Sequence, residues 1–374
     1  MDSPVTPDKF TVTVPIVAGV GNALMAVPMV RQIRRHRPEA QVSVVALTDA
    51  MAEPFRRLRE VNEVFVSGKG TSGYARGIRF TRRHHPDVYL VPFPSNRWQY
   101  NMLAAASRAR RVVMHEYPIG AWSTFTFVSG AERISAQRGI HDVVQNLRLL
   151  RVLGINPDET ERPEFMVNAT DRGRAAELLH RAEVRGDERF IAIHAGSART
   201  VLAQAKRWPT ENYAELITEF RREMSQPIVL LEGPDEGGVA DEIVARLKTN
   251  ISEFSVLKLA GPLGDVAAVL ERAALYVGSD SGLAHLAAAV GTPAVTLFGP
   301  ADPDRVCPFG YRHLVVQAPR DCSPCMLYPW QATRPIVRCR EPMCITSITV
   351  DSILSKTRTA LLETARRKEP AAKL

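Results

Sequence analysis

The residue types best suited to chemistry lie in the sequence GSDSGLAH at positions 278–285, between an apolar stretch and a predicted helix. Ser279 and Asp280 lie between the apolar stretch and the helix, so one of them is predicted to be the N-cap residue. Free N–H groups at the start of a helix, with the helix dipole, favour an anion, and Gly282 lets a phosphate approach the backbone. His285 follows one turn after Ser281 and can donate a hydrogen bond to a diphosphate oxygen. This junction predicts a phosphate site; the alternative is that Asp280 only caps and His285 only packs.

A second polar loop supplies positive charge. It reads HAGSARTVLAQAKRWP, residues 194–209, between a predicted strand and a predicted helix. Ser197 offers a hydroxyl in a tight turn, while Arg199 and Lys206 bring cations to the end of the same sheet. Cations beside a diphosphate stabilise both the bound ligand and its departure. The alternative is a solvated basic loop, and Trp208 is predicted to pack rather than to stack on a ligand.

A third strand-end loop is acidic. It reads EGPDEGG, residues 232–238, after an apolar run. Glu236, or less favourably Glu232, can accept hydrogen bonds from ribose hydroxyls, as acidic residues at strand ends do in dinucleotide sites. The alternative is that this segment, rich in turn-forming residues, only forms a turn and binds no ligand.

The loop AGVGN at residues 18–22 joins the first predicted strand to the first predicted helix. Gly19 and Gly21 match the first two glycines of the dinucleotide-binding fingerprint, but Leu24 stands where the third is required. This mismatch disfavours a nicotinamide-dependent enzyme. The chain also lacks the G-x-x-x-x-G-K-[ST] sequence of a P-loop.

All five cysteines lie in the last fifth of the sequence, and four of them follow the spacing C-x2-C-x13-C-x4-C. Four thiolates are enough for a tetrahedral structural zinc or iron ion. The spacing is not that of a standard zinc finger, and buried free thiols are the alternative. The four cysteines are Cys322, Cys325, Cys339 and Cys344, and Cys307 is taken as a bystander.

The elements that position these loops alternate between short apolar runs and longer amphipathic stretches, which is typical of parallel sheets covered by helices. The alternation pauses at a polar, proline-containing linker at residues 155–165 and then restarts. We therefore predict an α/β chain with two doubly wound sheets facing a central cleft, with ligands at the carboxyl ends of the strands. The predicted parts are residues 1–160, residues 161–350 with a cysteine-rich excursion at 320–345, and a C-terminal helix with a basic tail at 351–374 that packs back on the first domain.

Composition limits the partners. The 374 residues are 45% hydrophobic and 24% charged, as in globular proteins, and their formal net charge is +8. The basic residues form small clusters at 31–37, 79–85 and 366–368 rather than the concentrated stripe of a nucleic-acid binder. We therefore expect no nucleic-acid partner; the charge suits anionic small molecules or a membrane surface with anionic lipid, and solvated helix faces are the alternative.

Hydropathy predicts a cytoplasmic protein. No stretch reaches the roughly 18 apolar residues that a membrane-spanning helix needs. Residues 1–9 also lack the basic and apolar regions of a signal peptide.

Together these loops resemble glycosyltransferase family 9, the heptosyltransferases. The resemblance implies a GT-B fold of two Rossmann-like domains and inverting transfer, without a catalytic metal, of a sugar from a nucleotide donor such as ADP-heptose. It also implies an acceptor that is a lipopolysaccharide core or related glycan at the cytoplasmic face of the inner membrane. The matching segments, in order, are GNALMAVPMVRQIRRHRP, HDVVQNLRLLRVLGI, GSARTVLAQAKRWP, GPDE and SDSGLAHLAAAVGTPAVTLFGPADPDR.

The resemblance also implies roles for individual residues. Ser197 and Lys206 would hold the donor diphosphate, with Arg199 beside them, and Glu236 would hold the ribose. The phosphate and the sugar would lie at the helix start, against Asp280, Ser281, Gly282 and His285.

The acceptor side departs from the family. Gly21 is followed by Asn22, where members of the family usually carry an aspartate taken to deprotonate the acceptor. An asparagine is not a base, and general-base catalysis typically contributes about 10²- to 10⁴-fold. Three explanations stay open: another base acts, with His115, Glu116 and His194 as candidates; Asn22 orients the acceptor while the leaving diphosphate or water takes the proton; or the chain binds a sugar nucleotide without transferring the sugar.

Two other functions compete with the transferase. One is a sugar-nucleotide epimerase on the same scaffold, which would interconvert sugar nucleotides without an acceptor. The other is a catalytically impaired sugar-nucleotide-binding protein, and Asn22 is the residue that favours it.

Overall fold

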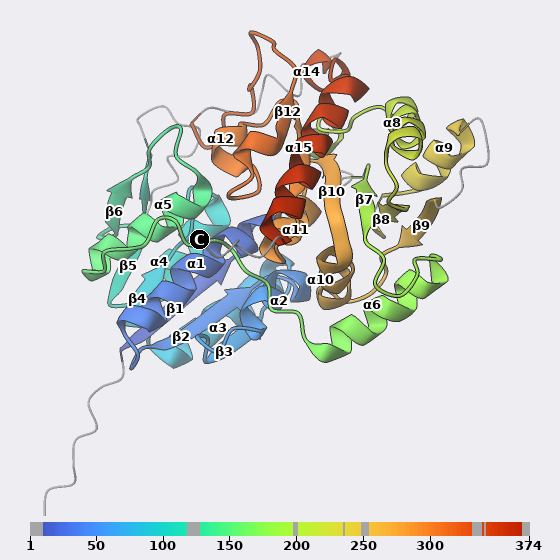
Figure 1. Cartoon of the computed structure of the whole chain (residues 1–374). Helices are drawn as coiled ribbons and strands as arrows, with labels where there is room; N and C mark the ends of the chain where they lie inside the picture. Colours follow the sequence, from blue (N-terminus) through green and yellow to red (C-terminus); the bar gives the residue numbers. More distant parts are fainter. Residues whose placement is uncertain are drawn as a thin grey trace, which may run out of the picture. The chain divides into compact units, whose positions relative to one another are not determined.

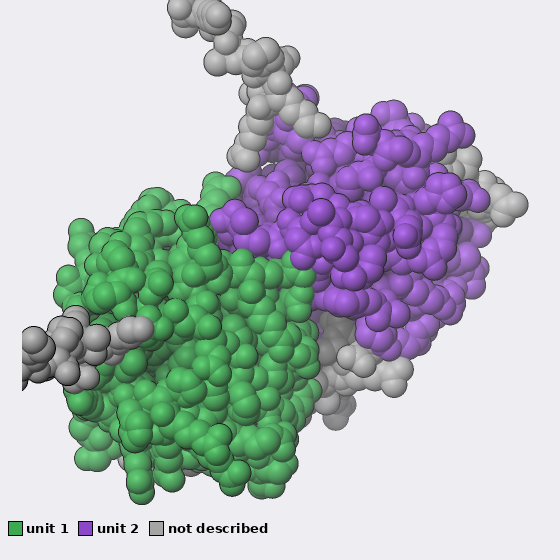
Figure 2. Space-filling view, turned by 90° about the horizontal axis from the view of Figure 1, so that it is seen from below, with its two compact units in different colours: residues 1–163 green, residues 164–374 purple. Residues whose placement is uncertain are grey.

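The computed structural model describes residues 10–117, 128–196, 201–234, 236–247, 254–330, 339 and 342–368. The chain divides into two compact units, residues 1–163 and 164–374, shown in different colours in Figure 2. The division lies within the polar, proline-containing stretch at residues 155–165. Ser197 and Arg199 lie outside the described residues.

Unit 1 contains a six-stranded sheet in the order β3-β2-β1-β4-β5-β6, and its neighbouring strands are parallel. The strands are β1 (Thr11–Ile16), β2 (Gln41–Ala46), β3 (Glu63–Val66), β4 (Val88–Leu90), β5 (Arg111–Glu116) and β6 (Glu132–Ser135). The helices are α1 (Val20–His36), α2 (Asp49–Arg56), α3 (Gly70–His84), α4 (Trp98–Ala106), α5 (Asp142–Arg148) and the 3-10 helix η1 (Leu149–Leu153).

Unit 2 repeats this architecture, with strands in the order β12-β11-β10-β7-β8-β9, again parallel (Figure 1). The strands are β7 (Phe190–His194), β8 (Ile228–Glu232), β9 (Phe254–Lys258), β10 (Ala273–Ser279), β11 (Ala294–Phe298) and β12 (Val315–Gln317). The helices are α6 (Ala169–Arg181), α7 (Val201–Gln204), α8 (Thr210–Glu223), α9 (Val239–Arg246), α10 (Leu263–Arg272), α11 (Gly282–Ala289), α12 (Pro303–Val306), η2 (Arg312–Leu314), α14 (Met343–Thr346) and α15 (Val350–Lys368).

Both sheets reverse their winding direction next to their first strand. In unit 1 the strand order reverses between β1 and β4, and in unit 2 it reverses between β7 and β10. In doubly wound sheets, ligands bind at the carboxyl ends of the strands next to such a switch point. The prediction of two doubly wound, Rossmann-like sheets is thus confirmed.

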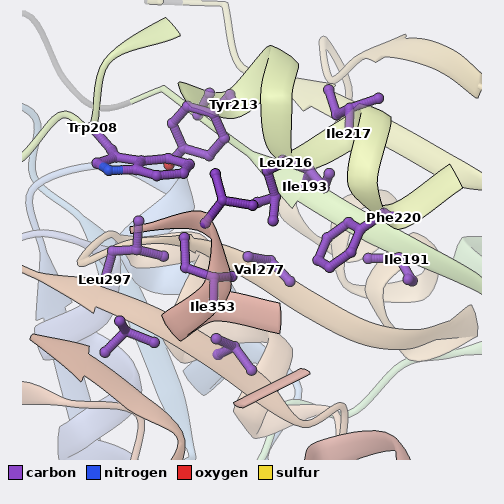
Figure 3. Close-up of a cluster of buried hydrophobic side chains, with 14 of the residues drawn as sticks. Ile191, Ile193, Trp208, Tyr213, Leu216, Ile217, Phe220, Val277, Leu297 and Ile353 are labelled. Atoms are coloured by element: carbon purple, nitrogen blue, oxygen red, sulfur yellow. The ribbon is translucent and has the colours of Figure 1, made fainter. Parts of the chain in front are cut away.

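A large apolar core fills the space between the unit 2 sheet and its helices (Figure 3). The sheet contributes side chains such as Ile193 and Val277, which are fully buried. Trp208 is 2% exposed, packs edge-on against Tyr213, and donates its Nε1–H to the Ile348 carbonyl oxygen at 3.0 Å. Trp208 therefore packs, as predicted.

The C-terminal helix packs on the second unit, where α15 contacts α8, β10, β11 and β12 (Figure 1). Ile353 and Leu354 lie in the same core as Val277. The physical reason is that the apolar stripe of α15 completes the cover of the unit 2 sheet.

This packing predicts that Ile353→Ala destabilises unit 2. Ile353 is 0% exposed, and truncating a buried isoleucine typically costs about 2–5 kcal/mol. Leu362→Ala on the same helix is the control, because that side chain is 61% exposed. Urea unfolding measures both variants, and equal loss of free energy of unfolding in the two would contradict the placement of α15.

Candidate nucleotide-sugar site

An ion pair lies at the carboxyl end of β10, next to the switch point of unit 2. Asp280 follows the last residue of β10, and its Oδ2 lies 2.5 Å from Nζ of Lys206, two residues beyond α7. The exposed fractions are 8% for the aspartate side chain and 20% for the lysine side chain. The structure therefore brings together two side chains that lie 74 positions apart and were both predicted for the site.

The start of α11 adjoins this pair. Ser281, and not the predicted Ser279 or Asp280, is the N-cap residue, in extended conformation, because β10 continues through Ser279 and Gly282 is the first residue of the helix. The Ser281 hydroxyl lies 3.2 Å from the Tyr276 hydroxyl and 3.4 Å from Nδ1 of His194. Because the first N–H groups of a helix have no partner within the helix, this end presents donors and positive potential to an anion.

Across the switch point, an acidic side chain pairs with a histidine. Oε1 of Glu236 lies 2.5 Å from Nε2 of His194, the last residue of β7, and Oε2 accepts a hydrogen bond of 2.9 Å from the Gly233 N–H. Burial alone would raise the pKa of the Glu236 carboxyl, but the hydrogen bond and charge of His194, with help from Gly233 and Arg207, lower it overall. Glu236 is thus held as a carboxylate that accepts hydrogen bonds.

Close packing fixes where this carboxylate lies. A Cβ atom at Gly196 would lie 2.0 Å from the Glu236 carboxylate, well inside van der Waals contact. The glycine after β7 therefore leaves the space that the acidic side chain occupies. Glu232, the alternative, instead accepts a hydrogen bond of 3.2 Å from the Ala240 N–H at the start of α9.

His285, in the first turn of α11, lies within electrostatic reach of the ion pair and is 8% exposed. Burial lowers its pKa, Lys206 lowers it further, and Asp280 partly opposes both. The ring is therefore neutral near pH 7, with one nitrogen as a donor and the other as an acceptor.

In unit 1, the predicted acceptor-side residues occupy the first turn of α1. Gly21 and Asn22 follow β1 at the switch point of that sheet and are partly exposed. The loop from β4 to α4 leaves the same switch point, and sequence reasoning did not single it out. In this loop the Ser95 N–H donates to the Tyr117 hydroxyl at 2.7 Å, and Asn96 is 2% exposed.

The three candidate replacements for a base differ in accessibility. His115 is fully buried, its Nε2 lies 3.1 Å from the Gln145 carbonyl oxygen, and burial lowers its pKa to about 4. His194 is committed to Glu236, whereas Glu116 is exposed at the end of β5. Burial removes both His115 and His194, which is 1% exposed, from direct contact with an acceptor, and leaves Glu116 as the accessible candidate.

The cysteine segment braces the loop that follows β11. The N–H of Cys325 donates to the Pro300 carbonyl oxygen at 3.1 Å, and Ser323 Oγ donates to the Gly299 carbonyl oxygen at 2.7 Å. Burial raises the pKa of the Cys325 thiol, and Cys322 and Cys339 raise it further.

Cys344 lies in the same group. Burial raises its pKa to about 11, with further effects from Cys325, Cys322 and Cys339. Among the described residues, no three or more histidine, cysteine or acidic side chains are arranged to hold a metal ion. The four thiols thus lie within electrostatic reach of one another without forming a ligand set.

Within the described residues, no helix combines the length and hydropathy needed to cross a membrane.

Curated relatives are heptosyltransferases. The chain is 25% identical over 297 residues to lipopolysaccharide heptosyltransferase 3 of Escherichia coli K12, covering 75% of this chain and 80% of that protein. It is 26% identical over 321 residues to lipopolysaccharide heptosyltransferase 2 of the same strain, covering 80% and 85%.

Solved structures share the fold. A glycosyltransferase family 9 protein from Veillonella parvula superposes with a TM-score of 0.75 at 19% identity, covering 95% of this chain and 98% of that one. The E. coli heptosyltransferase WaaC, solved with ADP, gives a TM-score of 0.66 at 18% identity, with 94% and 99% covered. The iron-containing dodecameric glycosyltransferase TibC of enterotoxigenic E. coli gives 0.59 at 12% identity, with 95% and 77% covered.

The family itself is settled by sequence. The model of glycosyltransferase family 9 (heptosyltransferase) matches residues 123–332, more than half of the chain, and this range contains the Lys206–Asp280 pair and Glu236. The chain therefore belongs to glycosyltransferase family 9, the heptosyltransferases, and is a glycosyltransferase.

Proposed function

We propose that this glycosyltransferase transfers a heptose, with inversion, from ADP-heptose to a lipopolysaccharide core or a related lipid-linked glycan. The observation that carries the proposal is the Lys206–Asp280 pair at the start of α11. One relative is a heptosyltransferase solved with ADP, and the curated relatives are lipopolysaccharide heptosyltransferases, which supports both the donor and the acceptor.

In this proposal the donor diphosphate lies against the first turn of α11. The N–H groups of that turn and the Lys206 ammonium supply the positive charge that the departing ADP needs. Oδ2 of Asp280 lies 2.5 Å from Nζ of Lys206 and so keeps the ammonium at this end of the sheet before the donor binds. Ser281 and the neutral His285 offer further hydrogen bonds to the phosphates, and in this proposal the transfer needs no catalytic metal. Ser197 and Arg199 retain their proposed place beside the diphosphate.

Glu236 accepts hydrogen bonds from the ribose hydroxyls. His194 orients its carboxylate through Oε1, and the Gly233 N–H does so through Oε2. His194 also approaches Ser281 through Nδ1, at 3.4 Å. This histidine is therefore a positioning residue that links the ribose end of the donor site to the phosphate end.

On the acceptor side, Asn22 orients the attacking hydroxyl with its amide. An amide neither takes up a proton at neutral pH nor carries charge, so Asn22 acts by position, and the proton of the attacking hydroxyl passes to the leaving diphosphate or to water. The acceptor is reached from the cytoplasmic face of the inner membrane, with this chain as a peripheral protein.

The first prediction tests the donor site. Lys206→Ala and Asp280→Ala are expected to weaken ADP binding strongly, since each removes one member of the ion pair at the phosphate site. Losing a charge-assisted hydrogen bond typically costs about 1.5–3 kcal/mol, or roughly 10- to 150-fold in affinity. Calorimetric titration of ADP and ADP-heptose measures the loss.

Asn22→Ala serves as the matched control, because it lies in unit 1 and is expected to leave ADP affinity nearly unchanged. Wild-type affinity in Asp280→Ala would show that the donor site is wrongly assigned. Binding of UDP-sugars in preference to ADP-heptose would favour the epimerase alternative instead.

The second prediction tests how the ribose is recognised. Wild-type enzyme should bind ADP more tightly than 2′- or 3′-deoxy-ADP, because Glu236 loses a hydrogen-bond donor when a hydroxyl is absent. Glu236→Ala should abolish the discrimination, and His194→Ala should reduce it by freeing the carboxylate. Competition binding with the three nucleotides measures this ratio.

A general loss of folding does not mimic this result, since it lowers the affinity for all three nucleotides alike. Partial rescue by His194→Gln, whose amide can still donate to the carboxylate, would support the positioning role. Unchanged discrimination in Glu236→Ala would refute it.

We also propose that the cysteine cluster holds a structural zinc or iron ion. The thiols do not form a ligand set as they lie, so binding would require them to close on the ion; four thiolates then suit either metal, and a protein of the same fold is an iron-containing glycosyltransferase. The bound metal would hold the segment that braces the residues after β11, at Gly299 and Pro300.

The third prediction is that purified protein carries about one metal ion per chain by elemental analysis. Cys325→Ser should lose the metal and lower the melting temperature, because a metal that binds the folded state stabilises it. Cys307→Ser is the control, since Cys307 lies outside the four-cysteine spacing. Metal-free protein with an unchanged melting temperature in Cys325→Ser would identify these residues as free thiols.

A further inference from the structure

The outer face of α3 in unit 1 carries a concentration of positive charge that the donor site does not use. The helix has no acidic residue, and three exposed arginines and an exposed histidine line one shallow hollow together with Ala75 and Ile78. We call these four residues the α3 basic surface. They are Arg79, Arg82, Arg83 and His85.

The seam between α3 and α4 joins this surface to an exposed aromatic side chain. Tyr74, Ile78 and Arg82 follow one another at four-residue spacing and so form one ridge of α3. At one end, the Tyr74 ring meets the Trp98 ring edge-on, with centroids 5.8 Å apart. At the other end, the Arg82 Nε–H donates to the Ala106 carbonyl oxygen at 2.8 Å. Eight residues of helix separate the two ends, or about 12 Å.

The exposure of Trp98 is unusual for its type. It is 48% exposed, although tryptophan is highly buried on average. Tryptophan and arginine side chains share a preference for the boundary between water and lipid, where an apolar body and a polar end are both satisfied. The seam therefore combines an aromatic end and a cationic end on one surface.

Nearby carboxylates do not neutralise the basic surface. Glu63 pairs with His84 at 2.8 Å, and Asp87 pairs with Arg110 at 3.1 Å. Within the part of the chain that the structure describes, Arg79 and Arg83 have no carboxylate within ion-pair distance.

Helix stability explains only part of this pattern. Cations in the last turn of a helix are stabilised by its dipole, which accounts for Arg82 and Arg83. It does not account for Arg79, which lies one turn earlier, or for the exposed Trp98.

We propose that the α3–α4 seam is the surface by which this protein docks on a membrane that contains anionic phospholipid. The arginines bind lipid phosphates through paired N–H donors, and Trp98 enters the interfacial layer. This inference rests on the proposed function, in which the acceptor is lipid-linked. The helix α4 begins with Trp98 at the carboxyl edge of the unit 1 sheet, the edge at which Asn22 lies, whereas α3 ends with Arg82 and Arg83 toward the opposite edge. In this proposal the Trp98 end of the seam is therefore the end that leads toward the acceptor side.

The experiment is co-sedimentation of the full chain with vesicles of phosphatidylcholine alone, or of equal parts phosphatidylcholine and phosphatidylglycerol. Binding is expected only to the anionic vesicles and should weaken as salt rises, because exposed charges are screened. The double variant Arg79→Gln and Arg83→Gln should bind on the order of 30-fold more weakly, at roughly fivefold for each basic residue near an anionic surface. Trp98→Ala should weaken binding independently.

The matched control is the double variant Arg181→Gln and Arg185→Gln in unit 2. It removes the same charge from exposed positions outside the seam and should bind vesicles like the wild type. If both double variants lost vesicle affinity equally, binding would depend on net charge alone and the proposal would be overturned. Release of the protein from vesicles by free inorganic phosphate, at the same concentration as the lipid phosphate, would also overturn the proposal. Tighter binding to RNA than to vesicles would overturn it as well.

A parallel ADP titration separates this inference from the proposed function. The seam variants should bind ADP like the wild type, because none of their residues belongs to the donor site. A protein that binds ADP but not anionic vesicles would refute the docking surface alone. A protein that binds vesicles through the seam but does not bind ADP would refute the donor assignment alone.

Discussion

The proposed donor site depends on the close approach of two parallel strands. Gly278 of β10 lies opposite His194 of β7 in the strand register. A Cβ atom at position 278 would lie 2.6 Å from the His194 carbonyl oxygen and 2.7 Å from the Tyr276 hydroxyl. Only a residue without a side chain lets the two strand ends run this close together. The loops that leave them then open at the same point, with Asp280 on one and the His194–Glu236 pair beside the other.

Charge compensation governs the side chains around that point. Lys206 and Asp280 neutralise each other, while Glu236 is balanced by His194, the Gly233 N–H and Arg207. Buried or half-buried charges without such partners would be costly, so the arrangement is stable before a ligand arrives. It also leaves the start of α11 as a source of positive potential, which is the property that a diphosphate needs.

The two units share one architecture but differ in the charge of the loops at the ends of their strands. Each sheet has the same strand order and the same kind of switch point, but the loops differ in charge. In unit 2 the loops carry the ion pair and the helix start, whereas in unit 1 they carry the uncharged Asn22 and the buried hydroxyls and amides of the β4–α4 loop. The residues proposed for function therefore lie in the loops, and the sheets hold those loops in place.

The doubly wound fold and the polar strand-end loops could be predicted from the sequence, because hydrophobic periodicity and turn chemistry are local signals; the family followed from the resemblance of the loop motifs. Parallel topology then placed Lys206 and Asp280 at one end of one sheet, as predicted. The pairing of His194 with Glu236, the burial of His115 and the packing of α15 on the unit 2 sheet emerged only in the folded structure. The short strand β6, with its mixed polar sequence ERIS, also lacked a local signal. These outcomes depend on which side chains fill the space between distant segments, and such packing follows from three-dimensional contacts rather than from spacing along the chain.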